Sequence, residues 1–164
     1  MLATPPTGVI GLREQAGGGD MKRAAFPGVM ILLLLLGAMP RAALAQTAMP
    51  PDAKVYIVWP YDGAVISGGK FWIRMGLSGA GIAPAGVEKP NTGHHHLLID
   101  TDLPPLDQPI PNDKNHLHFG GGQTEARIEL PPGKHTLQLL LGDASHVPTK
   151  PPLYSNKITI TVTQ

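Results

Sequence analysis

The sequence of 164 residues contains no cysteine. This absence excludes disulfide bonds, nucleophilic catalysis by a thiolate, and metal centres that need thiolate ligands, such as blue-copper sites. Most small exported domains gain stability from disulfides. A small domain without cysteine must therefore depend on its hydrophobic core, helped by a metal ion or a partner.

Charged residues are also few, at 15% of the chain, and the formal net charge is +1. The segment before Gln46 holds four of the thirteen basic residues and two of the twelve acidic ones, which leaves nine basic and ten acidic residues from Gln46 onward. A nearly neutral segment without a basic stripe is a poor candidate for binding nucleic acid or an anionic membrane. We therefore expect no nucleic-acid partner.

No apolar run reaches the roughly 20 residues that a membrane-spanning helix needs. The apolar stretch at 29–39 (VMILLLLLGAM) follows a basic start at 21–23 (MKR) and precedes the small residues ALA. This order is typical of a secretory signal peptide. We predict a signal peptide at 21–45, a periplasmic or secreted location, and no stable membrane span after cleavage. Residues 1–20 lack any apolar pattern, and we expect them to be a non-native extension from a start codon assigned too early.

The remaining segment, residues 46–164, reads as one all-β domain. Apolar and polar residues alternate in KFWIRMGLS (70–78), in HTLQLLL (135–141) and in KITITVT (157–163), and this period of two is typical of strands with one buried face. Turn residues separate the runs, and no helical period is sustained. The pattern predicts an immunoglobulin-like antiparallel β-sandwich of about seven strands.

Histidine is the residue that points to chemistry. Five of the seven histidines fall into two clusters, GHHHLLID with His94, His95 and His96, and NHLHFGGGQTE with His116 and His118. Residues two apart on a strand share a face, so His94 pairs with His96, and His116 with His118. If the two strands are neighbours, four imidazoles converge on one patch.

Such a patch suits copper or zinc, with copper favoured. The predicted metal ligands are His94, His96, His116 and His118, with His146 as a further ligand from the loop after LGD. His95 shares a face with Leu97 and Ile99 and is expected to point inward. His135, just after the PPG turn, is predicted to be a structural histidine with hydrogen-bond partners. The opposing interpretation is that all these histidines are exposed or only support the long Pro-rich loop.

From about Val55 to Val162 the chain resembles an uncharacterised family of exported bacterial domains, domain of unknown function 4399. The stretches that carry the resemblance are NTGHHHLLIDTDLP, HFGGGQTE, LPPGKHTLQLLLGD, and HVP followed by PP and KITITV. The resemblance implies a β-rich domain outside the cytoplasm and supplies no activity. The chain departs from the family pattern at Thr149-Lys150, where the resemblance leads us to expect another histidine.

Three functions fit these observations. The first is a periplasmic, non-catalytic module that binds a metal ion, copper in preference, through surface histidine pairs. The second is a structural or adaptor β-sandwich that binds an envelope protein or a glycan, with the histidines incidental. The third is an enzyme with an open metal position. We expect no catalytic residues, because Ser145 lacks a preceding nucleophile elbow and GGGQ lacks the lysine of a phosphate-binding loop.

The metal hypothesis carries one geometric condition, which concerns the ring nitrogens of His96 and His118. For one ion to bind both rings, these nitrogens must lie within about 5 Å of each other, because metal–nitrogen bonds are near 2 Å long. If the two histidine strands are not neighbours, the site fails.

Overall fold

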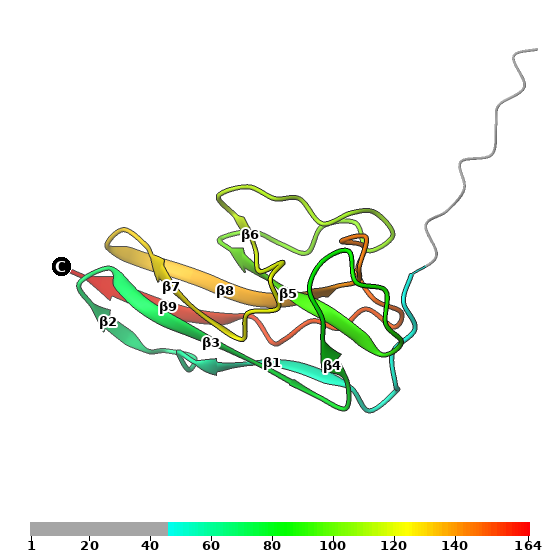
Figure 1. The fold of residues 1–164 in the computed structure, drawn as a ribbon. Helices are drawn as coiled ribbons and strands as arrows, with labels where there is room; N and C mark the ends of the chain where they lie inside the picture. Colours follow the sequence, from blue (N-terminus) through cyan, green and yellow to red (C-terminus); the bar gives the residue numbers. More distant parts are fainter. Residues whose placement is uncertain (1–45) are drawn as a thin grey trace, which may run out of the picture. The chain divides into compact units, whose positions relative to one another are not determined.

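The computed structural model describes residues 46–164, and the predicted extension and signal peptide lie outside them. The described part is all-β, as predicted, and contains no helix long and apolar enough to cross a membrane. Figure 1 shows its strands arranged in two layers. The strands are β1 (Lys54–Trp59), β2 (Val65–Ser67), β3 (Lys70–Ser78), β4 (Gly81–Ile82), β5 (Thr92–Ile99), β6 (His116–His118), β7 (Glu125–Glu129), β8 (Gly133–Gly142) and β9 (Ile158–Thr163).

The strands form two sheets. The three-stranded sheet has the order β1-β3-β7, and the six-stranded sheet has the order β2-β9-β8-β5-β4, with β6 also paired to β5. Pairing is antiparallel except at two short strands: β2 runs parallel to β9, and β4 runs parallel to β5. Strand β4 lies in a glycine- and proline-rich stretch between β3 and β5. The immunoglobulin-like sandwich is otherwise confirmed.

The core lies between the two sheets and is built by period-two alternation. In β3, Phe71, Ile73 and Met75 are buried, while the intervening Trp72 and Arg74 face outward. Leucines on one face of β8 and alternate residues of β9 complete the same apolar cluster. Because each inward side chain is almost fully removed from water, each contributes on the order of 2 kcal/mol of burial energy.

Strand β5 is buried along its whole length, on both faces. Its inner face places Leu97 and Ile99 in the core between the sheets. Its outer face is covered by the Pro-rich connection from β5 to β6, which packs partly buried leucines and Ile110 against Leu98 and Leu140. Figure 1 shows this connection on the side of β5 and β6 that faces away from β1 and β3. We call residues 100–115 the cover segment.

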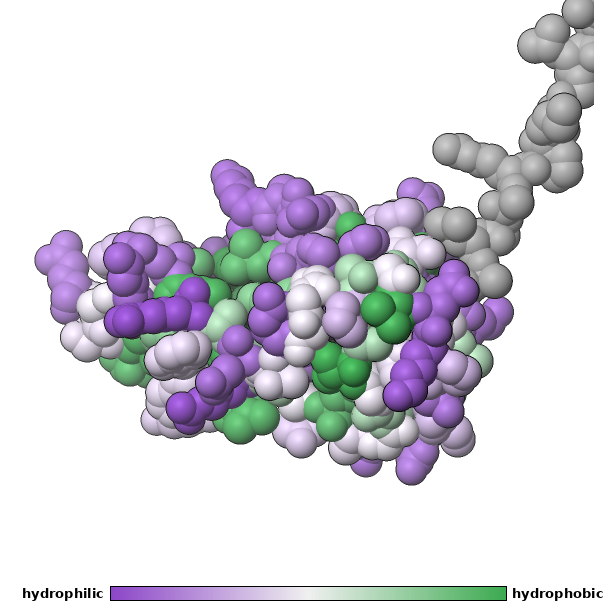
Figure 2. Space-filling model, in the orientation of Figure 1, coloured by the Kyte–Doolittle hydropathy of each residue, from purple (hydrophilic) through white to green (hydrophobic). Residues whose placement is uncertain are grey.

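The surface visible in Figure 2 is mixed. Hydrophobic residues form small green patches that are separated by hydrophilic ones. Exposed hydrophobic side chains include Tyr56, Val58 and Trp72, all from the three-stranded sheet. Scattered exposure of this kind is normal for a protein surface.

Candidate metal centre

The strand register brings the two histidine clusters together. Strands β5 and β6 pair antiparallel, with His96 directly opposite His118 and Leu98 opposite His116. Ring nitrogens of His94, His96 and His118 all lie within 4.8 Å of one another. The geometric condition on His96 and His118 is therefore met.

A fourth ring completes a compact group. His146 lies 4.8 Å from His118 and 5.1 Å from His94, measured between ring centroids. Across the six pairs of rings the centroid separations run from 4.8 to 6.1 Å. We call His94, His96, His118 and His146 the histidine quartet. Nearly equal separations among four points describe a distorted tetrahedron.

His146 reaches the quartet because the backbone of its loop is fixed. Its φ of 66° is left-handed, and its N–H donates to the carbonyl of Asp143, 2.9 Å away. The buried Asp143 carboxylate accepts the N–H groups of Ser145 and Val147 at 2.9 and 3.0 Å. The His146 carbonyl in turn accepts the N–H of Ile110, in the cover segment, at 2.8 Å. The loop and the cover segment therefore position each other.

Two glycines leave the space that the rings occupy. A Cβ at Gly142, on the outer face of β8, would lie 2.9 Å from His96 Nε2. A Cβ at Gly120 would overlap the ring of His118. Neither glycine has a positive φ, so the requirement for glycine comes from side-chain space and not from backbone conformation.

The quartet is more enclosed than the sequence predicted. His94 and His96 are 0% exposed, whereas the hypothesis placed both at the surface. That part of the prediction is wrong, because the cover segment folds back over the outer face of β5. His118 and His146 are half-buried, so solvent reaches the quartet on their side.

Burial favours the neutral form of three rings of the quartet, those of His94, His96 and His118. Loss of solvation, followed by repulsion from His118 and His146, lowers the pKa of His94 from 6.5 to about 4. Loss of solvation, followed by repulsion from His94, lowers the pKa of His96 to about 2, and loss of solvation with repulsion from His146 lowers the pKa of His118. Because a metal ion binds the neutral imidazole, protons do not compete for these rings at pH 7.

The buried rings leave polar atoms without partners. His94 Nε2 and His96 Nε2 lie 3.1 Å apart, close enough for one to donate a hydrogen bond to the other. The Nδ1 atoms of both rings and Nε2 of His118 are buried with no hydrogen-bond partner within residues 46–164. An unsatisfied buried polar group costs about 1–3 kcal/mol. The hydrogen bonds within the described residues therefore do not account for the burial of these rings, and the surrounding apolar packing must offset that cost.

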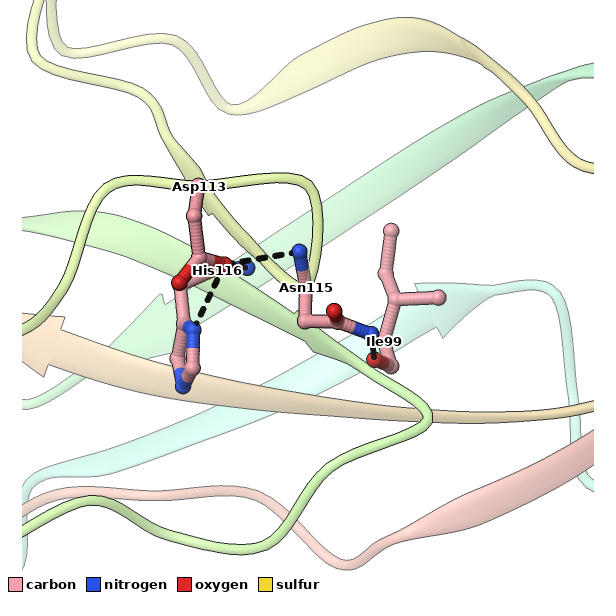
Figure 3. A network of polar contacts seen from close by, with 4 residues as sticks. All are labelled: Ile99, Asp113, Asn115 and His116. Carbon is pink, nitrogen blue, oxygen red and sulfur yellow. Dashed lines mark hydrogen bonds and ion pairs between the residues drawn. The ribbon is translucent and has the colours of Figure 1, made fainter.

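His116 lies outside the quartet, although it was predicted to be a ligand with the others. It shares the outer face of β6 with His118 but stands opposite Leu98, one pair further along the strand. Its Nδ1 lies 2.9 Å from Asp113 Oδ1 (Figure 3). His146, predicted only as a further ligand, takes the fourth position of the group.

The other two histidines, His95 and His135, lie outside the quartet. His95 is 0% exposed on the core side of β5, and neither of its ring nitrogens has a partner in the described chain. His135 has partners on both sides: Nδ1 lies 2.7 Å from Asp100 Oδ2, and Nε2 lies 2.9 Å from the Pro131 carbonyl. The structural role predicted for His135 is confirmed.

Sequence reasoning missed the residues that shape the site. Gly120 and Gly142 carry no signal of their own, because their role depends on which ring lies above them. Asp143 could have been predicted to hold a turn, because an aspartate carboxylate in a loop commonly accepts the backbone N–H two residues further on. Thr149, where the family pattern suggested a histidine, is fully buried.

The quartet fits a tetrahedral metal ion. With Zn–N bonds of about 2.0–2.1 Å, four imidazoles around one ion have neighbouring nitrogens about 3.3 Å apart and ring centroids about 5.2 Å apart. The nitrogens of His94 and His96 are separated by 3.1 Å, and the six centroid separations lie on both sides of the expected value. Small rotations of the rings are enough to direct three or four nitrogens at one point.

Comparisons with known proteins supply a family and no chemistry. The family model described as Domain of unknown function (DUF4399) matches residues 73–163. No curated protein matches the chain. A solved structure described as "Structures of Clostridium thermocellum CbhA fibronectin(III)-like modules" is similar over 66% of this chain and 92% of that chain, with 11% sequence identity and a TM-score of 0.33.

Proposed function

This chain belongs to the DUF4399 family, and we propose that it binds one transition-metal ion reversibly in the histidine quartet. The observation that carries the proposal is the convergence of ring nitrogens from His94, His96 and His118 within 4.8 Å. The buried Nε2 of His118, which has no hydrogen-bond partner in the described residues, supports the proposal, because a metal ion would accept its lone pair. The fourth ring, His146, lies at a centroid separation that suits the same ion.

The proposed binding is reversible because the site lacks the features of a permanent one. Structural metal sites usually have charged ligands and an outer layer of hydrogen bonds to the ligand histidines. Here every predicted ligand is neutral, and the Nδ1 atoms of His94 and His96 have no acceptor in the described part of the chain. Loss of such acceptors typically costs 10–100-fold in affinity. The site suits a protein that takes up and releases its ion.

Zinc and copper are the two candidate ions. Tetrahedral imidazole coordination suits Zn²⁺, and the nearly equal ring separations favour it on geometry. Copper(II) binds nitrogen ligands more tightly than zinc does, but it prefers a tetragonal arrangement. Geometry therefore favours zinc and intrinsic affinity favours copper, and one competition experiment decides between the two ions.

The proposed role is non-catalytic and outside the cytoplasm. Full burial of His94 and His96 leaves little room beside an ion for a substrate. Two cavities in the described residues, of about 590 and 440 Å³, are lined by other side chains. The signal-peptide pattern at residues 21–45 supports a periplasmic or secreted location.

Metal titration of the untagged protein tests the proposal. The protein is freed of metal with a chelator and titrated with Zn²⁺ or Cu²⁺ against a coloured competitor. We expect one ion per chain, with the preferred ion displacing the other. The double variant His96→Ala/His118→Ala should lose this binding.

The variant His135→Gln is the matched control, because it removes a histidine 9% exposed that lies outside the quartet. It should bind as the unaltered protein does. Failure of the unaltered protein to take up either ion at micromolar concentration would refute the proposal and favour the adaptor function.

A further inference from the structure

His116 and Asp113 form an oriented pair at the edge of the quartet that the proposed site does not use. The Asp113 carboxylate oxygen Oδ1 accepts the N–H groups of Asn115 and His116 at 2.8 and 3.0 Å, and it also lies 2.9 Å from His116 Nδ1. Figure 3 shows the carboxylate held between the backbone of its own turn and the imidazole. The arrangement fixes both the position and the rotation of the His116 ring.

The turn that carries this pair is tied to β5. Asn115 Nδ2 donates to the Ile99 carbonyl at 2.7 Å, and the Ile99 N–H donates to the Asn115 carbonyl at 2.8 Å. Figure 3 shows the contact from the Asn115 side chain to Ile99. His116 therefore has a fixed place relative to the strand that holds His94 and His96.

The free nitrogen of His116 is suited to bind a cation. An imidazole whose Nδ1–H donates to a carboxylate presents Nε2 as a lone pair, and this is the usual arrangement of a metal-ligating histidine. His116 Nε2 makes no hydrogen bond within residues 46–164, and the side chain is 12% exposed. The carboxylate of Asp113, 53% exposed, adds a negative charge that attracts cations.

His116 also lies beside the half-buried side of the quartet. It is two residues from His118 on the same face of β6, which places the Cα atoms about 6.6 Å apart. His118 is thus a neighbour both of the buried rings and of His116.

We propose that His116 is an entry ligand, which binds the incoming metal ion together with His118 before the ion passes to the quartet. This inference rests on the proposed function. In the transfer, water on the ion is replaced first by the nitrogens of His116 and His118. His116 then leaves, and His94 and His96 take its place. Only metal–ligand bonds change in this transfer, because each imidazole binds through a nitrogen lone pair and the ion keeps its charge.

The kinetics of metal uptake test this inference. Stopped-flow mixing of metal-free protein with Zn²⁺ held by a weak coloured chelator gives the rate of uptake, and an equilibrium titration gives the Kd. For His116→Ala we expect uptake and release each to slow about tenfold, the lower end of the effect of removing a residue that assists a metal ligand. The Kd should stay within about twofold, because an entry ligand changes the rate and not the end state.

Two further variants complete the design. Asp113→Asn keeps His116 but removes the carboxylate charge, and it should also slow uptake at an unchanged Kd. Asn112→Ala alters an exposed neighbour in the same turn with no side-chain hydrogen bond in the described residues, and it should load at the normal rate.

The outcomes separate the two proposals. If the unaltered protein binds no ion, the proposed function is refuted, and the entry ligand with it. If it binds but His116→Ala and Asp113→Asn load at the normal rate, only the entry ligand is refuted. A Kd weakened tenfold or more in His116→Ala also refutes the entry ligand, because His116 would then hold the ion in its final site.

Discussion

Replacing His95 with leucine should make the domain more resistant to acid. His95 is fully buried on the core side of β5, and burial lowers its pKa from 6.5 to about 4. Leucine has a similar volume, matches the neighbouring Leu97, and cannot be protonated. The substitution therefore removes a titrating group without leaving a large cavity.

The size of the effect follows from the pKa. The unfolded chain binds a proton at His95 near pH 6.5 and the folded chain only near pH 4, so the unfolded state binds more protons between these values. Stability therefore falls as the pH falls through this window. For this one group the loss between pH 7 and pH 5 is about 2 kcal/mol. At pH 7 the leucine should add about 1–3 kcal/mol, because two unpartnered nitrogens are removed.

Urea unfolding at pH 7 and pH 5, with a chelator present, measures both effects. Between the two pH values the free energy of unfolding of the unaltered protein should fall by about 2 kcal/mol more than that of His95→Leu. With an m-value near 2 kcal/mol/M, this corresponds to a difference of roughly 1 M in the shift of the urea midpoint. His94 and His96 remain in both proteins, so their own acid sensitivity cancels in the comparison. Equal losses in the two proteins would show that His95 is not held neutral by burial, and the reasoning would be refuted.

Three other changes test separate parts of the structure. Burial opposes a charge on His135, but its hydrogen bonds to Asp100 and the Pro131 carbonyl outweigh burial and raise its pKa. Its contribution to stability, about 1.5–3 kcal/mol, is therefore complete below pH 6.5 and is lost as the pH rises through the raised pKa. The difference in unfolding free energy between the unaltered protein and His135→Leu should shrink in alkali, and a constant difference would contradict this. Gly142→Ala should weaken metal affinity about tenfold by crowding a quartet ring, as measured by competition titration; an unchanged Kd would count against the site. Asp143→Ala should lower the free energy of unfolding, measured by urea denaturation, by about 3 kcal/mol, because buried N–H groups lose their acceptor. A loss below about 1 kcal/mol would mean that the loop keeps its conformation without the carboxylate.

The fold, and the face of the strand on which His94 and His96 lie, could be predicted from the sequence, because both depend on the alternation of side chains along a strand. Alternation along a strand places Leu97 inward and His96 outward whatever the partner strand is, so the two faces of β5 were predictable. The pairing of His96 with His118 also requires β5 and β6 to be neighbours, and alternation along a strand does not predict which strands pair.

The choice between His116 and His146 could not be predicted, because it depends on the conformation of two loops and not on alternation along a strand. His146 joins the rings through a left-handed residue held by the buried Asp143 and by Ile110 of the cover segment. His116 leaves them because the nearby Asp113 binds its ring. The burial of His94 under the cover segment was hidden for the same reason, since the leucines and prolines of that segment have no periodic pattern.

Gly120 and Gly142 belong to the sequence pattern of the quartet, although neither is a metal ligand. Gly120 follows His118 by two residues, and Gly142 precedes His146 by four, so each lies close in sequence to a quartet histidine. An unrelated sandwich given the four histidines alone would lack room for their rings. Transplanting the centre therefore requires six residues, H-x-H, H-x-G and G-x-x-x-H, and a search for related centres in other sequences should weigh the glycines as heavily as the histidines.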